Sequence, residues 1–406
     1  MAVTNFELSS NGTNGIPIDI TKATKKSITY ALNTGSKWIY SNYPEYMQSD
    51  SFIDTNFGAK YLNRVEVPAG THRIFYSHFN GGVYAAQPLP FTIGIRVYNS
   101  SGTLNLIVNK YGTAHSYVNG GGNDYCYTAA MAWKMFYDTA PGTANNLSNF
   151  GVGSTWICKQ VIQYNGWFTG VIDFYVSKAC AITVAAFKNQ ANASDSPSPY
   201  PLLIGTVGSY NPRKMYSGEA IGNSYTANIS LDVASIPVET YQWIPTCQDS
   251  SGISITGTGN IVPAGTDLLP ILKIAPKQNQ SAVEYAATMK PLNTNYTPTA
   301  EDKNIGNWHL EYNYNFSLTN SGGSDRTIKF YVQTTHTVAD GGKCYSIVRQ
   351  GSTLTWYNLP SGSLNAWRFL SLRISAGSTV AYSLPFKLIL GTNASIPMNL
   401  LYKTEV

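Results

Sequence analysis

Charged side chains are scarce in this 406-residue sequence and make up 12% of it, about half of the share found in an ordinary soluble domain. The 27 Lys and Arg residues exceed the 22 Asp and Glu residues, which gives a formal net charge of +5. No basic run is longer than the pair Lys25 and Lys26, whereas an electrostatic grip on nucleic acid needs a clustered basic patch or arm. The sequence therefore predicts no direct nucleic-acid binding.

Long apolar runs are missing as well. The longest candidates, around residues 179–187 and 268–275, have the length of a strand, whereas a membrane-spanning helix needs roughly 18 apolar residues. The first 15 residues contain neither the basic nor the apolar region of a secretory signal peptide. We therefore expect no membrane span and no signal peptide in this sequence. The expected location is a virion or the outside of the cell, and it depends on the structural role argued at the end of this subsection.

Motifs for catalysis and metal binding are also lacking. The five cysteines form no Cys-x-x-Cys pair, so zinc ribbons and thioredoxin-like sites are excluded and buried free thiols are expected. The sequence has no nucleophile elbow, phosphate-binding loop, dinucleotide fingerprint or His-Glu-x-x-His pattern. On one strand, His72 and His78 would lie about 20 Å apart, too far to share a metal ion. We expect no enzyme activity, no cofactor and no metal.

What the sequence does contain is period-two alternation of apolar and polar residues, which is typical of half-buried strands. The alternation is clearest over residues 308–318. There it predicts an inward face of Trp308, Tyr312, Tyr314 and Phe316 and an outward face of Glu311, Asn313 and Asn315. Helical periodicity is limited to residues 128–138 and, more weakly, 281–289. The patterns predict an all-β protein of antiparallel sheets with one or two short loop helices.

A proline-rich stretch divides the sequence near its middle. Residues 192–201 read NASDSPSPYP, a composition that favours an extended linker over a central strand. We therefore expect an N-terminal arm at 1–26, a first β-sandwich or jelly roll at 27–191, the linker at 192–201, and a second sandwich or jelly roll at 202–406.

The two halves share short sequence elements in the same order. The turn that begins at Asn99 returns at Asn320, and the VPAGT sequence of residues 67–71 returns at 262–266. A tandem duplication of one sandwich would produce this pattern. Chance would produce it too, because such turns are common at strand ends.

The arm is the first candidate contact site. Ile16, Ile18 and Ile20 alternate there with Pro17 and Asp19. Pro17 cannot donate a ladder hydrogen bond, and this suits an added edge strand rather than a central one. We expect the three isoleucines to lie against a sheet edge of a neighbouring subunit.

Four aromatic residues beside turn sequences form the second candidate contact site. They are Trp167, Phe168, Trp356 and Tyr357. Exposed Trp and Tyr side chains can stack on sugar rings or anchor a protein interface. We therefore expect these side chains to be exposed contacts for another subunit or for a glycan.

These features favour a non-enzymatic structural subunit that assembles with itself into a particle or filament, first of all a virion protein of the capsid or an appendage. Low charge, a Tyr- and Asn-rich surface and the broad flanks of β-sandwiches suit repeated contacts between copies. A secreted or surface carbohydrate-binding or adhesive module, with a glycan as partner, is the alternative. A β-rich pore-forming protein is a further alternative, because Ser- and Thr-rich stretches at 224–232 and 250–260 offer segments for rearrangement.

Overall fold

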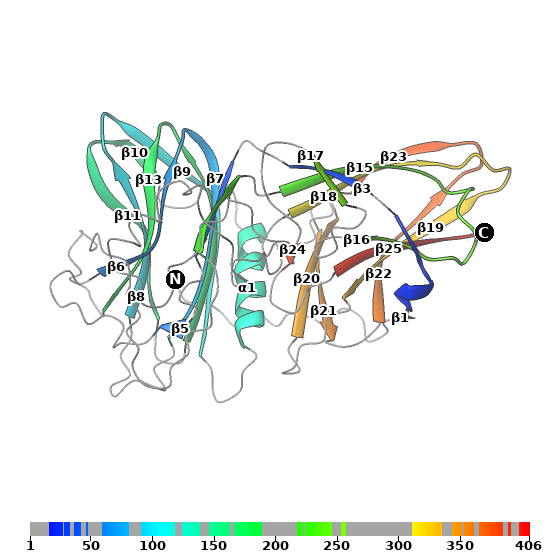
Figure 1. Ribbon diagram of the computed structural model, residues 1–406, viewed down its shortest axis with the longest axis horizontal. Coiled ribbons are helices and arrows are strands. Elements are labelled where there is room, and N and C mark those ends of the chain that lie inside the picture. Colours follow the sequence, from blue (N-terminus) through cyan, green and yellow to red (C-terminus); the bar gives the residue numbers. More distant parts are fainter. Residues whose placement is uncertain are drawn as a thin grey trace, which may run out of the picture. The chain divides into compact units, whose positions relative to one another are not determined.

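The described part of the chain consists mostly of strands, with one α-helix and one short 3-10 helix (Figure 1). The expected all-β fold is therefore confirmed. The described residues form two compact units, one within Gly35–Ile221 and one within Asn5–Thr34, Gly222–Asp267 and Lys303–Val406. The computed structural model describes residues 16–26, 28–32, 36–41, 46–47, 59–80, 91–117, 124–138, 146–162, 166–188, 217–221, 224–245, 253–256, 311–334, 343–350, 353–360, 365–384, 389–390 and 398–406.

The first unit is built from two sheets that share one apolar core. Its elements are β4 Lys37–Ser41, β5 Tyr46–Met47, β6 Ala59–Val67, β7 Gly70–Asn80, β8 Phe91–Asn99, β9 Leu104–Tyr117, α1 Asp124–Asp138, β10 Leu147–Phe150, β11 Gly153–Ile162, β12 Gly166–Val176, β13 Cys180–Lys188 and β14 Ser217–Ile221. The seven-stranded sheet has the order β10-β9-β12-β7-β4-β14, with β5 paired to β7, and the four-stranded sheet has the order β11-β8-β13-β6.

Eight consecutive strands of this unit, β6 to β13, have the connectivity of a jelly roll. β6, β8, β11 and β13 form one sheet, while β7, β9, β10 and β12 lie in the other. Every connection except that from β9 to β10 therefore passes from one sheet to the other, as in a double Greek key. The connection from β9 to β10 contains α1, which stands beside the seven-stranded sheet in Figure 1.

Period-two alternation fills the space between the two sheets. Ile93, Ile95 and Val97 of β8 point inward from one sheet, and Ile172 and Phe174 of β12 point inward from the other. All five belong to one cluster of buried side chains. The alternation that the sequence shows in β8 is therefore the pattern of a strand with one face in a core.

The second unit contains the N-terminal segment and the C-terminal half of the chain. Its elements are β1 Ile16–Pro17, the 3-10 helix Ile20–Lys22, β2 Thr24–Lys25, β3 Ile28–Leu32, β15 Ser224–Asp232, β16 Gln242–Pro245, β17 Ile253–Thr256, β18 Glu311–Thr319, β19 Arg326–Thr334, β20 Lys343–Gln350, β21 Thr353–Pro360, β22 Asn365–Ile374, β23 Thr379–Leu384, β24 Ile389–Leu390 and β25 Met398–Glu405. They form sheets of order β1-β22-β19-β25-β16-β2, β17-β3-β15-β18-β23 and β21-β20-β24.

Strand order in the second unit follows that of the first. The order β22-β19-β25-β16 matches β10-β9-β12-β7, and the pair β23-β18 matches β11-β8. In the first unit, β13 separates β6 from β8, whereas β15 and β18 of the second unit pair directly and in parallel. This pair differs from the expected antiparallel arrangement, and a tandem of two complete jelly rolls is not confirmed.

The alternation in residues 308–318 gives the expected faces where side chains are described. Tyr314 and Phe316 are buried, while Asn313 and Asn315 are half-buried on the other face of β18. Glu311, which begins β18 opposite Ser224 of β15, is buried instead of exposed. Trp308 and the side chain of Tyr312 lie outside the described residues.

The helix expected at residues 128–138 is confirmed as part of α1, and the one expected at 281–289 lies outside the described residues. The expected linker at 192–201 also lies outside them, so the domain boundaries remain a prediction. β14 pairs with β4 in the first unit, and β3 pairs with β15 in the second.

Candidate functional site

The outer face of the seven-stranded sheet is covered by α1 in its middle. Phe75 of β7, Val171 of β12 and Gly112 of β9 lie opposite one another across three neighbouring strands. A Cβ atom on Gly112 would lie 1.8 Å from the carbonyl oxygen of Ala132 and 2.5 Å from the amide nitrogen of Phe136. Glycine is therefore what lets the backbone of α1 lie directly on β9.

A partly buried ion pair lies beside this helix contact. Arg73 Nε and Nη2 donate hydrogen bonds of 2.7 and 2.8 Å to the two carboxylate oxygens of Asp173. The guanidinium group of Arg73 also lies 5.4 Å from the ring centroid of Trp133 and 5.1 Å from that of Phe136. Lys110 Nζ, on the neighbouring strand β9, lies 5.7 Å from the centroid of the same Phe136 ring. Aromatic residues of α1 thus pack on cations that the sheet presents.

The histidines of β7 serve the packing of the first unit. His72 Nδ1 accepts a hydrogen bond of 3.1 Å from the amide of Lys37, and its Nε2 lies 2.8 Å from the carbonyl oxygen of Pro68. His78 Nε2 lies 3.1 Å from the buried hydroxyl of Ser41. Burial lowers the pKa of His72 below its usual value. These contacts hold the neutral His72 ring in the fold and give both histidines a structural role.

Within the described ranges, no group of three or more His, Cys, Asp or Glu side chains is placed so as to hold a metal ion. No helix in the same part of the chain has the length and apolar character needed to cross a membrane.

In the second unit, the N-terminal segment covers the sheet that corresponds to the α1-covered sheet of the first. β1 pairs with β22 at one edge of this sheet, and β2 pairs with β16 at the other edge. The residues between β1 and β2 therefore cross a face of the sheet. We call residues 16–25 the strap.

Ile18 anchors the strap. Its side chain is 3% exposed and packs against Tyr331, Ala366 and Leu401. Gln333 Nε2 donates a buried hydrogen bond of 2.8 Å to the carbonyl oxygen of Ile18. The strap is thus held by apolar burial, by strand pairing at both ends and by polar contacts to its backbone, among them the hydrogen bond of 3.0 Å from the amide of Thr24 to the carbonyl oxygen of Tyr241.

The three isoleucines of the arm do not share one environment. Ile18 is buried, Ile16 is 42% exposed and Ile20 is half-buried. Strand geometry ends after Pro17, and the side chain of Asp19 caps the 3-10 helix by accepting a hydrogen bond of 3.0 Å from the amide of Thr21. The edge that receives the strap belongs to the same chain, which differs from the expected neighbour. The role of the arm in assembly remains a prediction.

The expected exposure of Trp167 and Phe168 needs correction. Trp167 is 4% exposed and Phe168 is 1% exposed. Their rings lie 4.9 Å from the Phe79 ring and 5.1 Å from the Tyr76 ring, respectively. The physical reason is that β12 lies between β7 and β9 inside the sheet, so that core or neighbouring rings cover both of its faces there.

The other two candidate aromatic residues cannot be compared with the expectation. Trp356 and Tyr357 belong to β21, which pairs with β20. Their side chains lie outside the described part of the structure.

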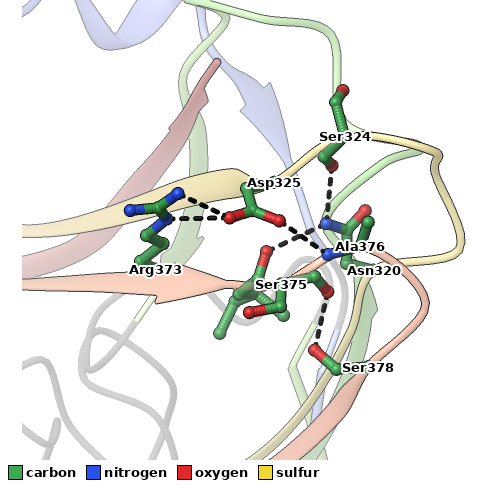
Figure 2. A network of polar contacts seen from close by, with 8 residues as sticks. Asn320, Ser324, Asp325, Arg373, Ser375, Ala376 and Ser378 are labelled. Atoms are coloured by element: carbon green, nitrogen blue, oxygen red, sulfur yellow. Dashed lines mark hydrogen bonds and ion pairs between the residues drawn. The ribbon is translucent and has the colours of Figure 1, made fainter.

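Short turns at one end of the second unit are tied together by polar side chains (Figure 2). Asn320 Nδ2 donates hydrogen bonds of 2.9 Å to the carbonyl oxygens of Ser324 and Ile374. Asp325 accepts a hydrogen bond of 3.0 Å from the amide of Ala376 and one of 2.9 Å from Arg373 Nε. These hydrogen bonds, that of Ala376 first, hold the pKa of the Asp325 carboxyl below its usual value. The network fixes the backbone of these turns.

Sequence reasoning missed Arg73, Asp173 and Gln333, the polar residues that hold α1 and the strap in place. A signal was present for the ion pair. Arg73 and Asp173 are single charges inside the apolar strand sequences THRIFYSHF and GVIDFYV. Charged side chains are rarely buried unless they are paired, so a single charge in such a strand predicts an oppositely charged partner nearby.

Comparison with known proteins shows no family for this chain. No protein-family model matches the sequence, and no curated protein matches it. A xanthan lyase from Paenibacillus is 9% identical over 84% of this chain and 24% of its own chain, with a TM-score of 0.13. The chain therefore spans about a quarter of that lyase.

A second solved structure gives a similar result. The tandem CBM22-1–CBM22-2 domain of Xyn10C from Paenibacillus barcinonensis is 10% identical over 81% of this chain and 74% of its own chain, with a TM-score of 0.12. Superpositions at this level carry no argument about fold or function.

Proposed function

We propose that this chain is a non-enzymatic structural subunit that assembles with copies of itself into a particle or filament, and that this assembly is a virion component such as a capsid or an appendage. The observation that carries the proposal is the closed first unit. Its eight jelly-roll strands enclose apolar side chains, and α1 lies on the outer face of one sheet. Jelly rolls serve as capsid domains, lectins and cupins, so the fold alone does not choose among them.

The covered sheet face favours the structural role over glycan binding. A sugar that stacks on a sheet needs exposed aromatic side chains on that face. Here Trp133 and Phe136 of α1 are buried, and so are the sheet residues Phe75 and Val171. The aromatic surface of this region is used within the unit and is closed to a sugar ring.

The packing of the unit interior disfavours a cupin-like site. Cupins are jelly rolls, and an enzyme or metal centre needs polar ligands that converge in a cavity. The cluster between the two sheets contains buried Ile, Val, Leu, Phe, Tyr and Cys side chains. The histidines on the same face of β7, His72 and His78, are hydrogen-bonded to groups of the fold, namely Lys37, Pro68 and Ser41. This interior supports a building block rather than a reaction chamber.

The pairing of β15 weighs against the pore-forming alternative. β15 covers the Ser- and Thr-rich stretch 224–232 and is hydrogen-bonded to β3 on one side and β18 on the other. Releasing it would break both ladders and expose the buried side chains of Ala227 and Ile229. Such a step costs more than the release of a free loop.

Electron microscopy of the purified full chain tests the proposal. Negative-stain images would be recorded at rising protein concentration and at low and high salt, with light scattering on the same samples. Particles or filaments of uniform width that dissociate on dilution support a structural subunit. A monomer under every condition that binds an immobilised glycan would overturn the proposal in favour of the carbohydrate-binding alternative.

A further inference from the structure

The outer face of the seven-stranded sheet continues beyond α1 into a region that no described element covers. Tyr175 of β12 lies opposite Thr71 of β7 and Ile107 of β9. The next outward row toward the sheet end is formed by Asn105, Asn149 and Ser177, which hydrogen-bond to one another. We call these six residues the open patch: Thr71, Asn105, Ile107, Asn149, Tyr175 and Ser177.

The apolar centre of the open patch is not required by the core. The side chains of Ile107 and Tyr175 are 39% and 38% exposed. Their chain neighbours Leu106 and Val176 point the other way and fill the core. Because the strand period is two, Ile107 and Tyr175 face outward, away from the core. Their exposed apolar atoms are therefore available to a partner.

The rim of the open patch is held in place before any partner binds. The amide of Asn149 donates a hydrogen bond of 2.8 Å to Asn105 Oδ1, and the amide of Asn105 donates one of 2.9 Å to Ser177 Oγ. The amide of Ser177 donates one of 3.0 Å back to the carbonyl oxygen of Asn105. A rim that is already ordered loses little conformational entropy on association, which favours binding.

The backbone at the edge of the patch is also specialised. Asn149 has a φ of 54°, in the left-handed region that asparagine tolerates better than most residues. The pairing of β10 with β9 shifts register between Leu147 and Phe150. Such irregularities re-aim side chains at sheet edges, and here they bring Asn149 onto Asn105.

The charge pattern indicates what the open patch binds. None of its six residues carries a charge. The nearest outward row holds Arg73, Asp173 and Lys110; Arg73 and Asp173 form an ion pair, and the ammonium group of Lys110 lies over the Phe136 ring of α1. The whole chain has a net charge of +5, so two copies repel each other, and this repulsion is weakest when the surfaces that face each other carry no charge. In a two-fold contact each patch meets itself, and any charge near the axis would face a like charge.

The residue types of the open patch are those of a protein interface. Protein interface cores are enriched in tyrosine and depleted in charged residues, and their rims carry polar groups. We infer that the open patch is a contact surface for a second copy of this chain, in a two-fold interface centred on Tyr175 and Ile107. This inference rests on the proposed function, since the contact is one of those that would build the assembly.

Serine substitutions test the centre of the patch. The double variant Tyr175→Ser with Ile107→Ser is compared with the full-length wild type and with Val161→Ser, a control at a 41% exposed strand position of β11 in the same unit. Sedimentation velocity gives the self-association constant, and thermal unfolding checks the fold. We expect at least a tenfold weaker association for the double variant, as for loss of a hot spot, and an unchanged value for the control.

A charge pair near the axis tests the two-fold geometry. Tyr175→Lys and Tyr175→Asp each place a charge on both copies close to the axis and should weaken association when each variant is measured alone. A mixture of the two variants should associate more tightly than either one, because opposite charges then meet. This readout does not depend on whether the serine variants fold.

The outcomes separate the inference from the proposed function. If the wild type assembles and the variants assemble equally well, with no gain on mixing, the inference about the open patch is overturned. The structural role of the chain would then still stand. A wild type that stays monomeric at all concentrations would overturn both. Glycan binding that is lost in Tyr175→Ser would reassign the patch to a sugar and would overturn the self-contact.

Discussion

Asn99 and Asn320 make equivalent hydrogen bonds at equivalent positions of the two units. Asn99 ends β8 and Asn320 directly follows β18, the corresponding strand. Each side chain is buried and donates from Nδ2 to the last residue of a corresponding strand, Phe150 of β10 at 3.2 Å and Ile374 of β22 at 2.9 Å. Each unit thus uses one asparagine to tie the same two turns together.

The rest of the two turns follows the same plan. Asn99 Nδ2 also donates to the carbonyl oxygen of Gly102 within its own turn, as Asn320 does to that of Ser324. On the acceptor side, Asn320 Oδ1 receives a hydrogen bond of 3.1 Å from the amide of Gly322. Shared strand order together with a shared buried side chain favours the duplication hypothesis over chance. The repeated VPAGT sequence adds nothing, because its second copy lies outside the described residues.

Replacing Asn320 with alanine should destabilise the second unit by about 1 to 3 kcal/mol, because two buried backbone acceptors lose their donor. The control is Asn315→Ala, whose side chain donates to Asn228 Oδ1 on the exposed face of the sheet and should change stability by less than about 0.5 kcal/mol. Urea unfolding followed by circular dichroism measures both. Equal losses for the two variants would contradict the role given to Asn320.

Adding a methyl group at Gly112 should displace α1. Gly112→Ala places a Cβ into the backbone of the helix, so we expect a loss of about 1 to 3 kcal/mol or more from overpacking. Gly323→Ala is the matched control, because nothing lies within 4 Å of a Cβ there. Thermal unfolding and hydrogen exchange of the α1 amides read out the change. Unchanged protection of α1 in Gly112→Ala would show that the helix does not depend on this contact.

The strap offers a matched pair of isoleucines. Ile18→Ala should cost about 2 to 5 kcal/mol, as for other buried isoleucines, and should open the strap to proteolysis. Ile16→Ala removes the same atoms from an exposed position and should have a small effect. Limited proteolysis followed by mass spectrometry locates the first cut. If the two variants behave alike, the strap does not pack as described.

Acidification should weaken the first unit through His72. Burial lowers the pKa of this residue in the folded chain, whereas the unfolded chain takes up the proton near pH 6.5. The stabilisation is therefore complete above about pH 6.5 and is lost as the pH falls through the folded-state pKa. Protonation of Nδ1 would also remove the acceptor for the Lys37 amide.

A comparison of pH profiles checks this. The melting temperature of His72→Gln should fall less steeply between neutral and mildly acidic pH than that of the wild type. The remaining slope includes His115, whose pKa burial also lowers. Parallel profiles for the two proteins would contradict the assignment.

The sequence predicted those features of the fold that depend on neighbouring residues in the chain. Alternation identified the buried face of β18 because period two is a property of a single strand, and apolar periodicity identified α1. Whether Trp167 is exposed depends on which strands flank β12, and whether Ile18 meets its own chain depends on Tyr331, more than 300 residues away. Such long-range pairings leave no local pattern, and so the site residues were harder to predict than the strands.

The mass distribution of the purified full-length chain tests the structural role most directly. Sedimentation velocity over a rising concentration series, at low and high salt, resolves monomer, dimer and larger species in one experiment. The account predicts discrete species larger than the monomer that grow with concentration and that are reduced by the double substitution at Tyr175 and Ile107. A single monomeric species throughout the series would contradict it.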